Sequence, residues 1–245
     1  RIMVDGRGIA TGVELESGEV VRADAVVAAA DLHHTETALV PDERATHPEG
    51  SWKRRQPGVS ALLVMAGVEG SLPELAHHSL FFTRDWDENF RAILGRELPP
   101  VPASVYVARP AATDPTVAPE GRESLFMLVP FPADPALGAT PQSRAALEKV
   151  ARAYLAQVEA WAGIPDLVAR STILSLTTPA DFATGLNAWQ GGALGLEHTL
   201  LQSAMFRPAN VSERIPNLLY AGASTTPGIG VPLCLISAEL VAKRL

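Results

Sequence analysis

The chain has 245 residues, of which 47% are hydrophobic and 19% are charged, and its formal net charge is -7. This length allows one large domain or two modest ones, and the apolar fraction is far too high for a disordered protein. The negative charge argues against a nucleic-acid binder, because neutralising phosphates provides most of the sequence-independent affinity for nucleic acids. The single cysteine, Cys234, excludes an intrachain disulfide and a cysteine-rich zinc site, so we expect an intracellular, cytoplasmic protein.

The first forty residues predict a β-meander followed by a helix. Three short strands separated by Asp-Gly and Ser-Gly turns are predicted in residues 1–29. The apolar run at 25–30 is typical of a strand that is covered on both faces. Asp31 follows this run and can cap a helix over residues 32–40. Because the chain opens at Arg1 directly into this meander, we expect it to be a piece of a longer protein.

Strand and helix patterns alternate through the middle of the chain without an internal repeat. Thr140 and Pro141 mark the start of the clearest helix, and Gly163 marks its end. A second helix begins after Asp85. Apolar runs predict strands over residues 61–65, 78–83, 104–108, 125–129 and 168–176. Because the order lacks strict strand-helix-strand alternation, it predicts an α+β domain with a largely antiparallel sheet.

Two pairs of adjacent histidines, His33-His34 and His77-His78, suggest a metal site. Adjacent side chains diverge on a strand or a helix, so neither pair is expected to chelate one ion, and no metalloprotease spacing occurs. We therefore predict no metal site. Ser224 lacks the second glycine of a nucleophile elbow, which argues against a serine hydrolase.

A glycine-rich segment near the C-terminus carries the strongest chemical signal. Residues 218–221 predict a short buried strand, and Pro232 lies where a helix would begin. The apolar stripe predicted for that helix is Leu233, Ile236, Leu240 and Val241. Gly222, Gly228 and Gly230 permit backbone approaches that a Cβ would forbid. A loop of this kind offers N–H groups and the positive end of a helix dipole to an electron-rich ligand. A tight strand-to-helix turn would use the same residues, and spacing alone does not choose between the two interpretations.

This segment, from Asn217 to Pro232, resembles the C-terminal flavin-contacting signature of the bacterial-type phytoene desaturases, G-A-x-T-x-P-G-x-G-x-P. Residues 178–182, 191–198 and 202–208 resemble the run that leads into that signature. The resemblance extends over the whole chain. It implies that FAD is contacted by Gly222, Ala223, Pro227, Gly228, Ile229, Gly230, Val231 and Pro232.

The resemblance implies a mixed α+β and α/β fold that corresponds to the C-terminal half of such an enzyme. Residues 1–40 would be returning strands of a Rossmann-like FAD-binding domain. Residues 41–205 would form a substrate-binding domain with a largely antiparallel mixed sheet and helices, and residues 206–245 would return to the FAD-binding domain. The G-x-G-x-x-G unit that holds the FAD pyrophosphate has no counterpart in the chain. We therefore expect this chain alone to be inactive and not to retain FAD.

The implied activity is the FAD-dependent desaturation of an apolar isoprenoid polyene, such as phytoene, in carotenoid biosynthesis. A hydrocarbon offers no charged handle, so its site must bind it by apolar burial. No residue is assigned as catalytic acid or base. The alternatives are a related flavoprotein (a carotenoid isomerase, a ketolase or an amine-oxidase-like enzyme) and a non-catalytic polyene- or lipid-binding half of a split enzyme. An amine oxidase would need an aromatic cage, for which Trp189 and Phe206 are the candidates.

Apolar surfaces and the nature of the substrate lead to two further expectations. Residues 25–30 and 233–245 are apolar enough to predict self-association of the chain. The stretch 231–242 is interrupted by Glu239 and is too short to span a bilayer. Peripheral contact with the inner face of the cell membrane is compatible with this composition.

Overall fold

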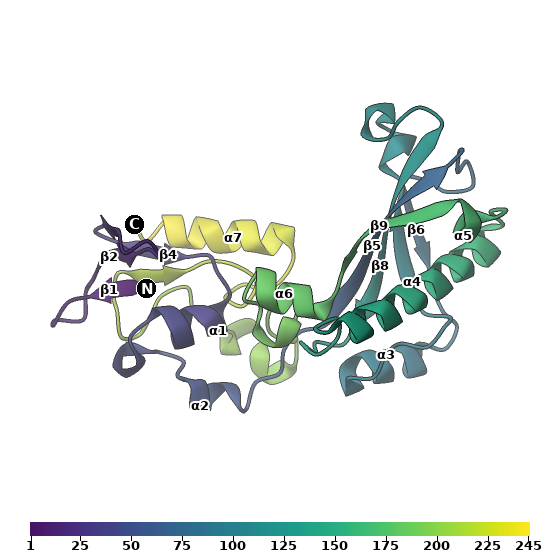
Figure 1. The fold of residues 1–245 in the computed structure, drawn as a ribbon. Coiled ribbons are helices and arrows are strands. Elements are labelled where there is room, and N and C mark those ends of the chain that lie inside the picture. Colours follow the sequence, from purple (N-terminus) through teal and green to yellow (C-terminus); the bar gives the residue numbers. More distant parts are fainter. The chain divides into compact units, whose positions relative to one another are not determined.

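The computed structural model describes all residues from 1 to 245 and divides the chain into two compact units. Unit 1 combines Arg1–Gly58 with Ala183–Leu245, and unit 2 is the continuous segment Val59–Phe182 (Figure 1). The sequence-based division at 40/41 and 205/206 differs from these limits. The difference arises because Trp52 and Leu196 are buried in the hydrophobic core of unit 1.

Unit 2 is built on one five-stranded sheet, in the order β6-β7-β8-β5-β9, with every neighbouring pair antiparallel. The strands are β5 (Ser60–Glu69), β6 (His78–Phe81), β7 (Val105–Ala108), β8 (Arg122–Phe131) and β9 (Ser171–Thr177). The sheet confirms the antiparallel prediction. Strand β9 begins three residues later than expected, because the short helix α5 (Leu167–Arg170) occupies the start of the predicted range.

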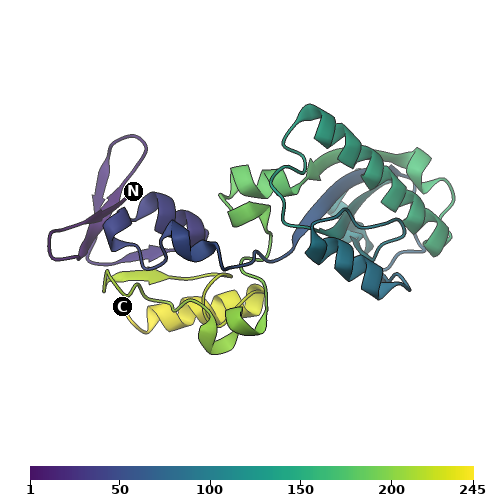
Figure 2. The same cartoon turned by 90° about the horizontal axis from the view of Figure 1, so that it is seen from below.

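The long helix α4 (Pro141–Ala162) covers one face of this sheet (Figure 2). Thr140 caps it by accepting a hydrogen bond from the Ser143 N–H, and Gly163 ends it with a φ of 68°. Both ends are where the sequence predicts them. The fully buried Tyr154 of α4 belongs to the hydrophobic core that the sheet completes. The other helices of this region are α3 (Trp86–Gly95), α6 (Pro179–Gly185) and the 3₁₀ turns η3 (Pro110–Ala112) and η4 (Pro115–Val117).

Unit 1 contains a three-stranded antiparallel meander and a separate parallel pair of strands. The meander is β1 (Ile2–Val4), β2 (Ala10–Glu14) and β3 (Val20–Arg22), and the parallel pair is β4 (Val26–Ala28) with β10 (Leu218–Tyr220). The meander confirms the prediction. The expectation that the run 25–30 is covered on both faces is wrong for this chain, because Val27 is 43% exposed while its neighbour Val26 is buried. Strand β4 forms its ladder of hydrogen bonds with β10 alone.

Short helical segments surround these strands. Asp31 caps α1 (Leu32–His34) as predicted, and the helix continues as a π turn, η1 (Thr35–Leu39). The remaining segments are η2 (Asp42–Arg44), α2 (Glu49–Trp52), η5 (Trp189–Gly191), η6 (Leu200–Gln202), η7 (Ala204–Phe206) and α7 (Val231–Ala242). None of the helices combines the length with the hydropathy that a span of the bilayer requires.

Candidate functional site

The glycine-rich segment connects β10 to α7, as the sequence predicts. Gly230 immediately precedes the helix and has a φ of 104°, and no side chain caps the helix N-terminus. The first N–H groups of any helix have no acceptor within the helix. Val231, the first helical residue, is 75% exposed. The loop therefore presents free N–H groups and the positive end of the α7 dipole at an open surface.

The three glycines of this loop have different surroundings. A Cβ added to Gly222 or Gly230 would meet no atom within 4 Å, whereas one on Gly228 would lie 3.3 Å from His198 Nε2 and 3.6 Å from Leu233 Cδ1. All three have a positive φ. Gly222 and Gly230 thus leave open space against the backbone, where a flat ligand could lie, while Gly228 packs against the protein itself.

The other five residues expected to contact FAD form the rest of this loop and the first turn of α7. Ala223, Pro227 and Ile229 are partly buried, and Pro227 follows a cis peptide bond after Thr226. Val231 and Pro232 are exposed. The loop is therefore partly buried at Ala223, Pro227 and Ile229, and it becomes exposed where α7 begins.

A buried guanidinium group holds the loop from below. The Arg207 side chain donates hydrogen bonds to the carbonyls of Thr225, Gln202 and Leu196, at 3.2, 3.1 and 3.3 Å, and to that of Ala223. Arg207 is 4% exposed, and burial lowers its pKa. Its charge is stabilised by carbonyl dipoles from two segments of the chain, and it joins those segments. Nothing in the sequence pattern had singled it out.

Asn210 and Ser237 complete this buried support. Asn210 Nδ2 lies 2.9 Å from the Thr226 carbonyl and 3.0 Å from Ser237 Oγ. Ser237 in turn accepts a hydrogen bond from the Gly222 N–H at 3.1 Å. The predicted apolar stripe of α7 is therefore partly wrong: Ser237 is fully buried, while Ile236 is 43% exposed. The buried face of α7 combines Ser237, which hydrogen-bonds to the loop, with the stripe residue Val241, which is 3% exposed.

A second polar cluster fixes the end of β10 that leads into the loop. The buried Glu36 carboxylate accepts hydrogen bonds from the Tyr220 hydroxyl and from the His47 backbone N–H. Burial raises the pKa of Tyr220, and Glu36 raises it further. Burial, and then the nearby Arg55 charge, lower the pKa of His47 to about 4. Arg55 Nη2 lies 3.2 Å from His47 Nδ1, so the imidazole is neutral and carries its proton on Nε2.

One of the two histidine pairs differs from its expected geometry. The His77 and His78 rings are packed 4.3 Å apart instead of diverging, because His77 precedes the first residue of β6 and the alternation of a strand does not apply to it. In the other pair, His33 Nε2 lies 3.0 Å from Glu49. No group of three or more His, Cys, Asp or Glu residues is placed to hold a metal ion.

The two candidates for an aromatic cage have different roles. Trp189 packs against Trp52 and His33, with ring centroids 5.0 and 5.7 Å apart. Phe206 is 57% exposed and lies on a turn of its own, η7. Trp189 is therefore part of an internal aromatic cluster of unit 1.

Unit 2 has an apolar surface on the sheet face that also carries Met65. Cross-strand partners form one row over four strands: Leu80, Tyr106, Leu128 and Leu63. Beside this row, Met65 is 46% exposed and Leu174 is 71% exposed. Leu174 lies over Gly67, and its Cδ1 would be in ordinary van der Waals contact, at 3.5 Å, with a Cβ at that position. The result is an extended apolar surface on an otherwise well-packed sheet.

Residues 1–245 match the family described as "Flavin containing amine oxidoreductase". The chain belongs to this family. The resemblance to desaturases is also confirmed: the chain is 38% identical over 233 residues to the carotenoid 3,4-desaturase of Haloarcula japonica, and 39% identical over 247 residues to the zeta-carotene-forming phytoene desaturase of Myxococcus xanthus. These matches cover 95% and 100% of this chain and 46% of each relative, so the chain spans about half the length of the curated relatives it matches.

A solved structure supports the fold. The crystal structure of an oxidoreductase from Methanosarcina mazei superposes with a TM-score of 0.58 at 17% identity, over 99% of this chain and 48% of that one. Together with the family match, this confirms the expected mixed α/β fold of a flavoprotein fragment.

Proposed function

We propose that this chain provides the flavin-contacting loop and the substrate-binding surface of an FAD-dependent enzyme that desaturates an apolar isoprenoid polyene such as phytoene. The observation that carries the proposal is the open backbone at Gly222 and Gly230, directly before the uncapped N-terminus of α7. Family membership supports the flavin, and the activities of the two desaturases support a carotenoid-type substrate.

The loop residues suit a flavin ring. Gly222 and Gly230 leave room for a flat group to lie on the backbone, and the dipole of α7 would stabilise negative charge on the reduced ring. Arg207 and Asn210 hold the loop in this shape from the buried side. When bound, FAD would accept the hydride as a saturated C–C bond loses a hydride and a proton to become C=C.

The apolar face of unit 2 suits the proposed substrate. A polyene hydrocarbon gains free energy from leaving water and offers nothing to hydrogen-bond. Leu63, Leu128 and the exposed Met65 and Leu174 form a surface of that chemistry. We accordingly assign flavin contact to unit 1 and substrate contact to unit 2, which moves the proposed domain limits from 40/41 and 205/206 to the limits of the units.

Two partner interactions belong to the same proposal. Val27 on β4 and Leu235 on α7, 43% and 68% exposed, support self-association of this chain. Light scattering over a range of concentrations tests it, and a monomer at every concentration would contradict it.

We also propose peripheral contact with the inner face of the cell membrane, because an apolar polyene dissolves in a bilayer and not in water.

The test uses the flavin-loaded, full-length protein that contains residues 1–245. Mixing it with a micellar acyclic polyene without oxygen should bleach the flavin absorption and move the polyene absorption to longer wavelength. Bleaching by amines alone would establish the amine-oxidase alternative, and a changed polyene spectrum with unchanged flavin would favour an isomerase. Polyene binding with neither change would leave a binding module.

A further inference from the structure

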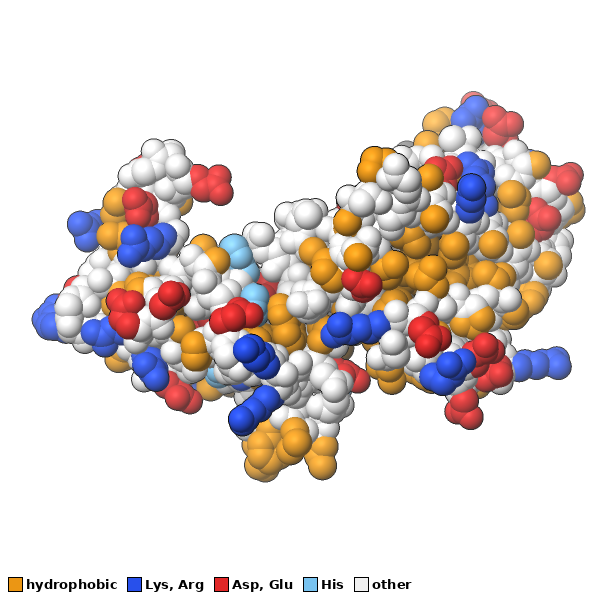
Figure 3. Space-filling view, turned by 60° about the horizontal axis from the view of Figure 1, so that its bottom comes forward, with side chains coloured by type: hydrophobic (Ala, Val, Ile, Leu, Met, Phe, Trp, Pro, Cys, Tyr) orange, Lys and Arg blue, Asp and Glu red, His pale blue; other side chains and the backbone are white.

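Four neighbouring apolar side chains project from unit 1. Leu200, Leu201, Met205 and Phe206, which we call the apolar tip, are 83%, 75%, 87% and 57% exposed and lie on η6 and η7. Figure 3 shows a projecting group of hydrophobic side chains in this part of the molecule, with Lys and Arg side chains nearby. Contiguous exposed apolar side chains of this kind mark an interaction surface.

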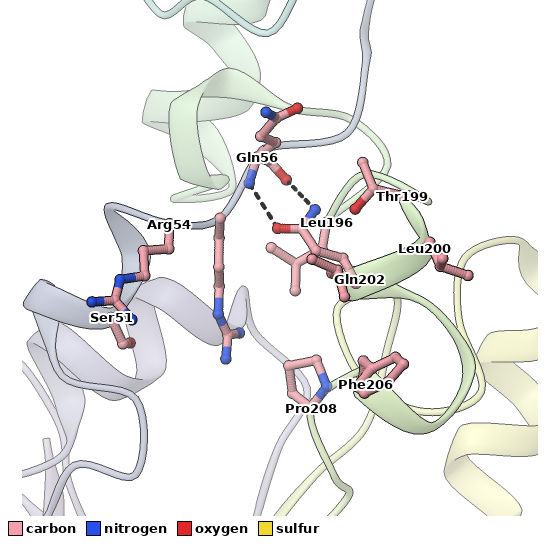
Figure 4. Close-up of a pocket in the computed structure, with 11 residues that line it drawn as sticks. Ser51, Arg54, Gln56, Leu196, Thr199, Leu200, Gln202, Phe206 and Pro208 are labelled. Atoms are coloured by element: carbon pink, nitrogen blue, oxygen red, sulfur yellow. Dashed lines mark hydrogen bonds between the residues drawn. The ribbon is translucent and has the colours of Figure 1, made fainter.

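A cavity of about 750 Å³ lies beside the apolar tip. Its apolar lining comes from Leu196, Leu200, Leu201, Phe206 and Pro208, and its polar lining includes Ser51, Arg54 and Arg55. Figure 4 shows Ser51 and Arg54 on one side of the cavity, with Leu200 and Phe206 on the other. No acidic side chain lines it. The cavity is therefore apolar on one side and positively charged on the other.

The two sides are held together by a reciprocal pair of hydrogen bonds. The Gln56 N–H donates to Gln202 Oε1 at 2.8 Å, and Gln202 Nε2 donates to the Gln56 carbonyl at 3.1 Å (Figure 4). Gln202 is 8% exposed and belongs to η6, while Gln56 follows directly on the basic residues. These hydrogen bonds hold Arg54 and Arg55 beside the apolar tip, so the two groups form one surface.

Two polar atoms of the cavity lining have no partner. Ser51 Oγ and Arg55 Nη1 are both buried without a hydrogen bond. The Nη2 atom of Arg55 is already engaged with His47, and its guanidinium group lies 4.8 Å from the centre of the Trp52 ring. Buried donors are rarely left unsatisfied, because each costs the free energy of its lost hydration. Because both atoms are covered by protein, they do not themselves reach the cavity, and its accessible positive charge is that of the exposed Arg54.

We propose that this surface docks on a bilayer that contains anionic lipids. The apolar tip enters the boundary between headgroups and acyl chains, while the exposed Arg54 takes the phosphate of one lipid. Arginine suits this role because its planar donors match phosphate oxygens. An apolar tip beside cations is the pattern of interfacial membrane binding. The formal net charge of -7 means that attraction to an anionic surface has to come from a local patch such as this one.

A second exposed apolar stripe provides the internal comparison. Phe90 and Leu94 on α3 are 52% and 55% exposed, but acidic residues occupy the first turn of that helix. An anionic bilayer would repel that turn. The two regions therefore have similar apolar exposure and opposite local charge, and only the apolar tip should bind.

The experiment is co-sedimentation of the 245-residue chain with vesicles of phosphatidylcholine, alone or mixed equally with phosphatidylglycerol. The chain should bind the mixed vesicles. The triple variant Leu200→Ser, Leu201→Ser, Met205→Ser should weaken that binding about tenfold or more. Arg54→Gln should weaken it about fivefold on mixed vesicles only. The matched control, Phe90→Ser with Leu94→Ser, should bind like the original chain, and circular dichroism should show every variant folded.

Three results would overturn the proposal. One is loss of binding in the α3 control while the triple variant still binds. Another is displacement from the vesicles by inorganic phosphate at the same phosphate concentration, which would make the cavity a site for free phosphate. The third is a triple variant that becomes monomeric in light scattering but binds vesicles unchanged, which would assign the apolar tip to self-association. This proposal rests on the proposed membrane contact and assigns that contact to particular residues. The vesicle test needs neither flavin nor polyene, so a negative result would leave the flavin proposal standing.

Discussion

The sheet of unit 2 and the loop of unit 1 are stabilised in different ways. In unit 2, α4 buries Leu147, Tyr154 and Val158 against the sheet, and apolar burial accounts for the packing. In the loop, the buried groups are the side chains of Arg207 and Asn210, and hydrogen bonds to backbone carbonyls fix the shape. In unit 2, one face of each element is buried by apolar side chains. In the loop, the buried hydrogen bonds leave the outer side of the backbone uncovered, which is what a ligand-binding loop requires.

The strongest test of this difference is Arg207→Met. Removing the guanidinium group leaves four carbonyls, three of them buried, without their donor, so we expect the free energy of unfolding to fall by about 3–5 kcal/mol. Urea denaturation measures it. The control is Arg152→Met, which removes an exposed pair with Glu148 on α4 and should cost less than about 0.5 kcal/mol. Equal losses in the two variants would mean that the loop does not depend on its polar support.

The His47 cluster predicts that unit 1 has its own pH dependence. The folded-state pKa of His47 is lowered from 6.5 to about 4, so the unfolded chain binds more protons between these values and stability falls as the pH decreases through that window. Between pH 7 and 5 we expect a loss of about 2 kcal/mol. In His47→Asn, the amide oxygen can still accept from Arg55 without titrating, and this pH dependence should disappear. An unchanged dependence would show that other groups cause it.

Substitutions on the open face of unit 2 should have the smallest effect on stability. Met65→Ser and Leu174→Ser change exposed side chains, so the free energy of unfolding should change by less than about 0.5 kcal/mol. In the full-length enzyme, the KM for the polyene should rise by about three- to tenfold, because apolar contact area is lost. Steady-state kinetics beside the exposed control Leu94→Ser on α3 measures this. If the control raises KM equally, the open face is not the substrate surface.

The scaffold could be predicted from the sequence because its signals are local. Thr140, Pro141 and Gly163 bound α4, and the alternating or continuous apolar runs locate the strands. The buried polar support could not be predicted in this way. Arg207 and Thr225 are neighbours only after folding, and no sequence periodicity connects an arginine to the carbonyls that it will meet.

The glycine loop lies between these two cases. Its position between a short strand and a helix followed from local patterns, yet the three glycines looked equivalent. Gly228 is packed against His198, which comes from a distant part of the chain, while Gly230 is open. The predicted apolar stripe of α7 was partly wrong for the same reason, since Ser237 is buried by hydrogen bonds to residues outside its own helix. Contacts between distant segments decide which residues of the site remain exposed.

The most direct test of the flavin loop compares Gly230→Val with Gly18→Val in the full-length protein that contains this chain. Both glycines have a positive φ, 104° and 82°, and a Cβ at either would meet no atom within 4 Å. Each substitution places a side chain at a positive φ and should cost backbone strain, about 1–3 kcal/mol. We predict that flavin per folded molecule falls by about tenfold or more in Gly230→Val and is unchanged in Gly18→Val. Equal flavin content in the two variants, at equally lowered melting temperatures, would contradict contact between this loop and the flavin.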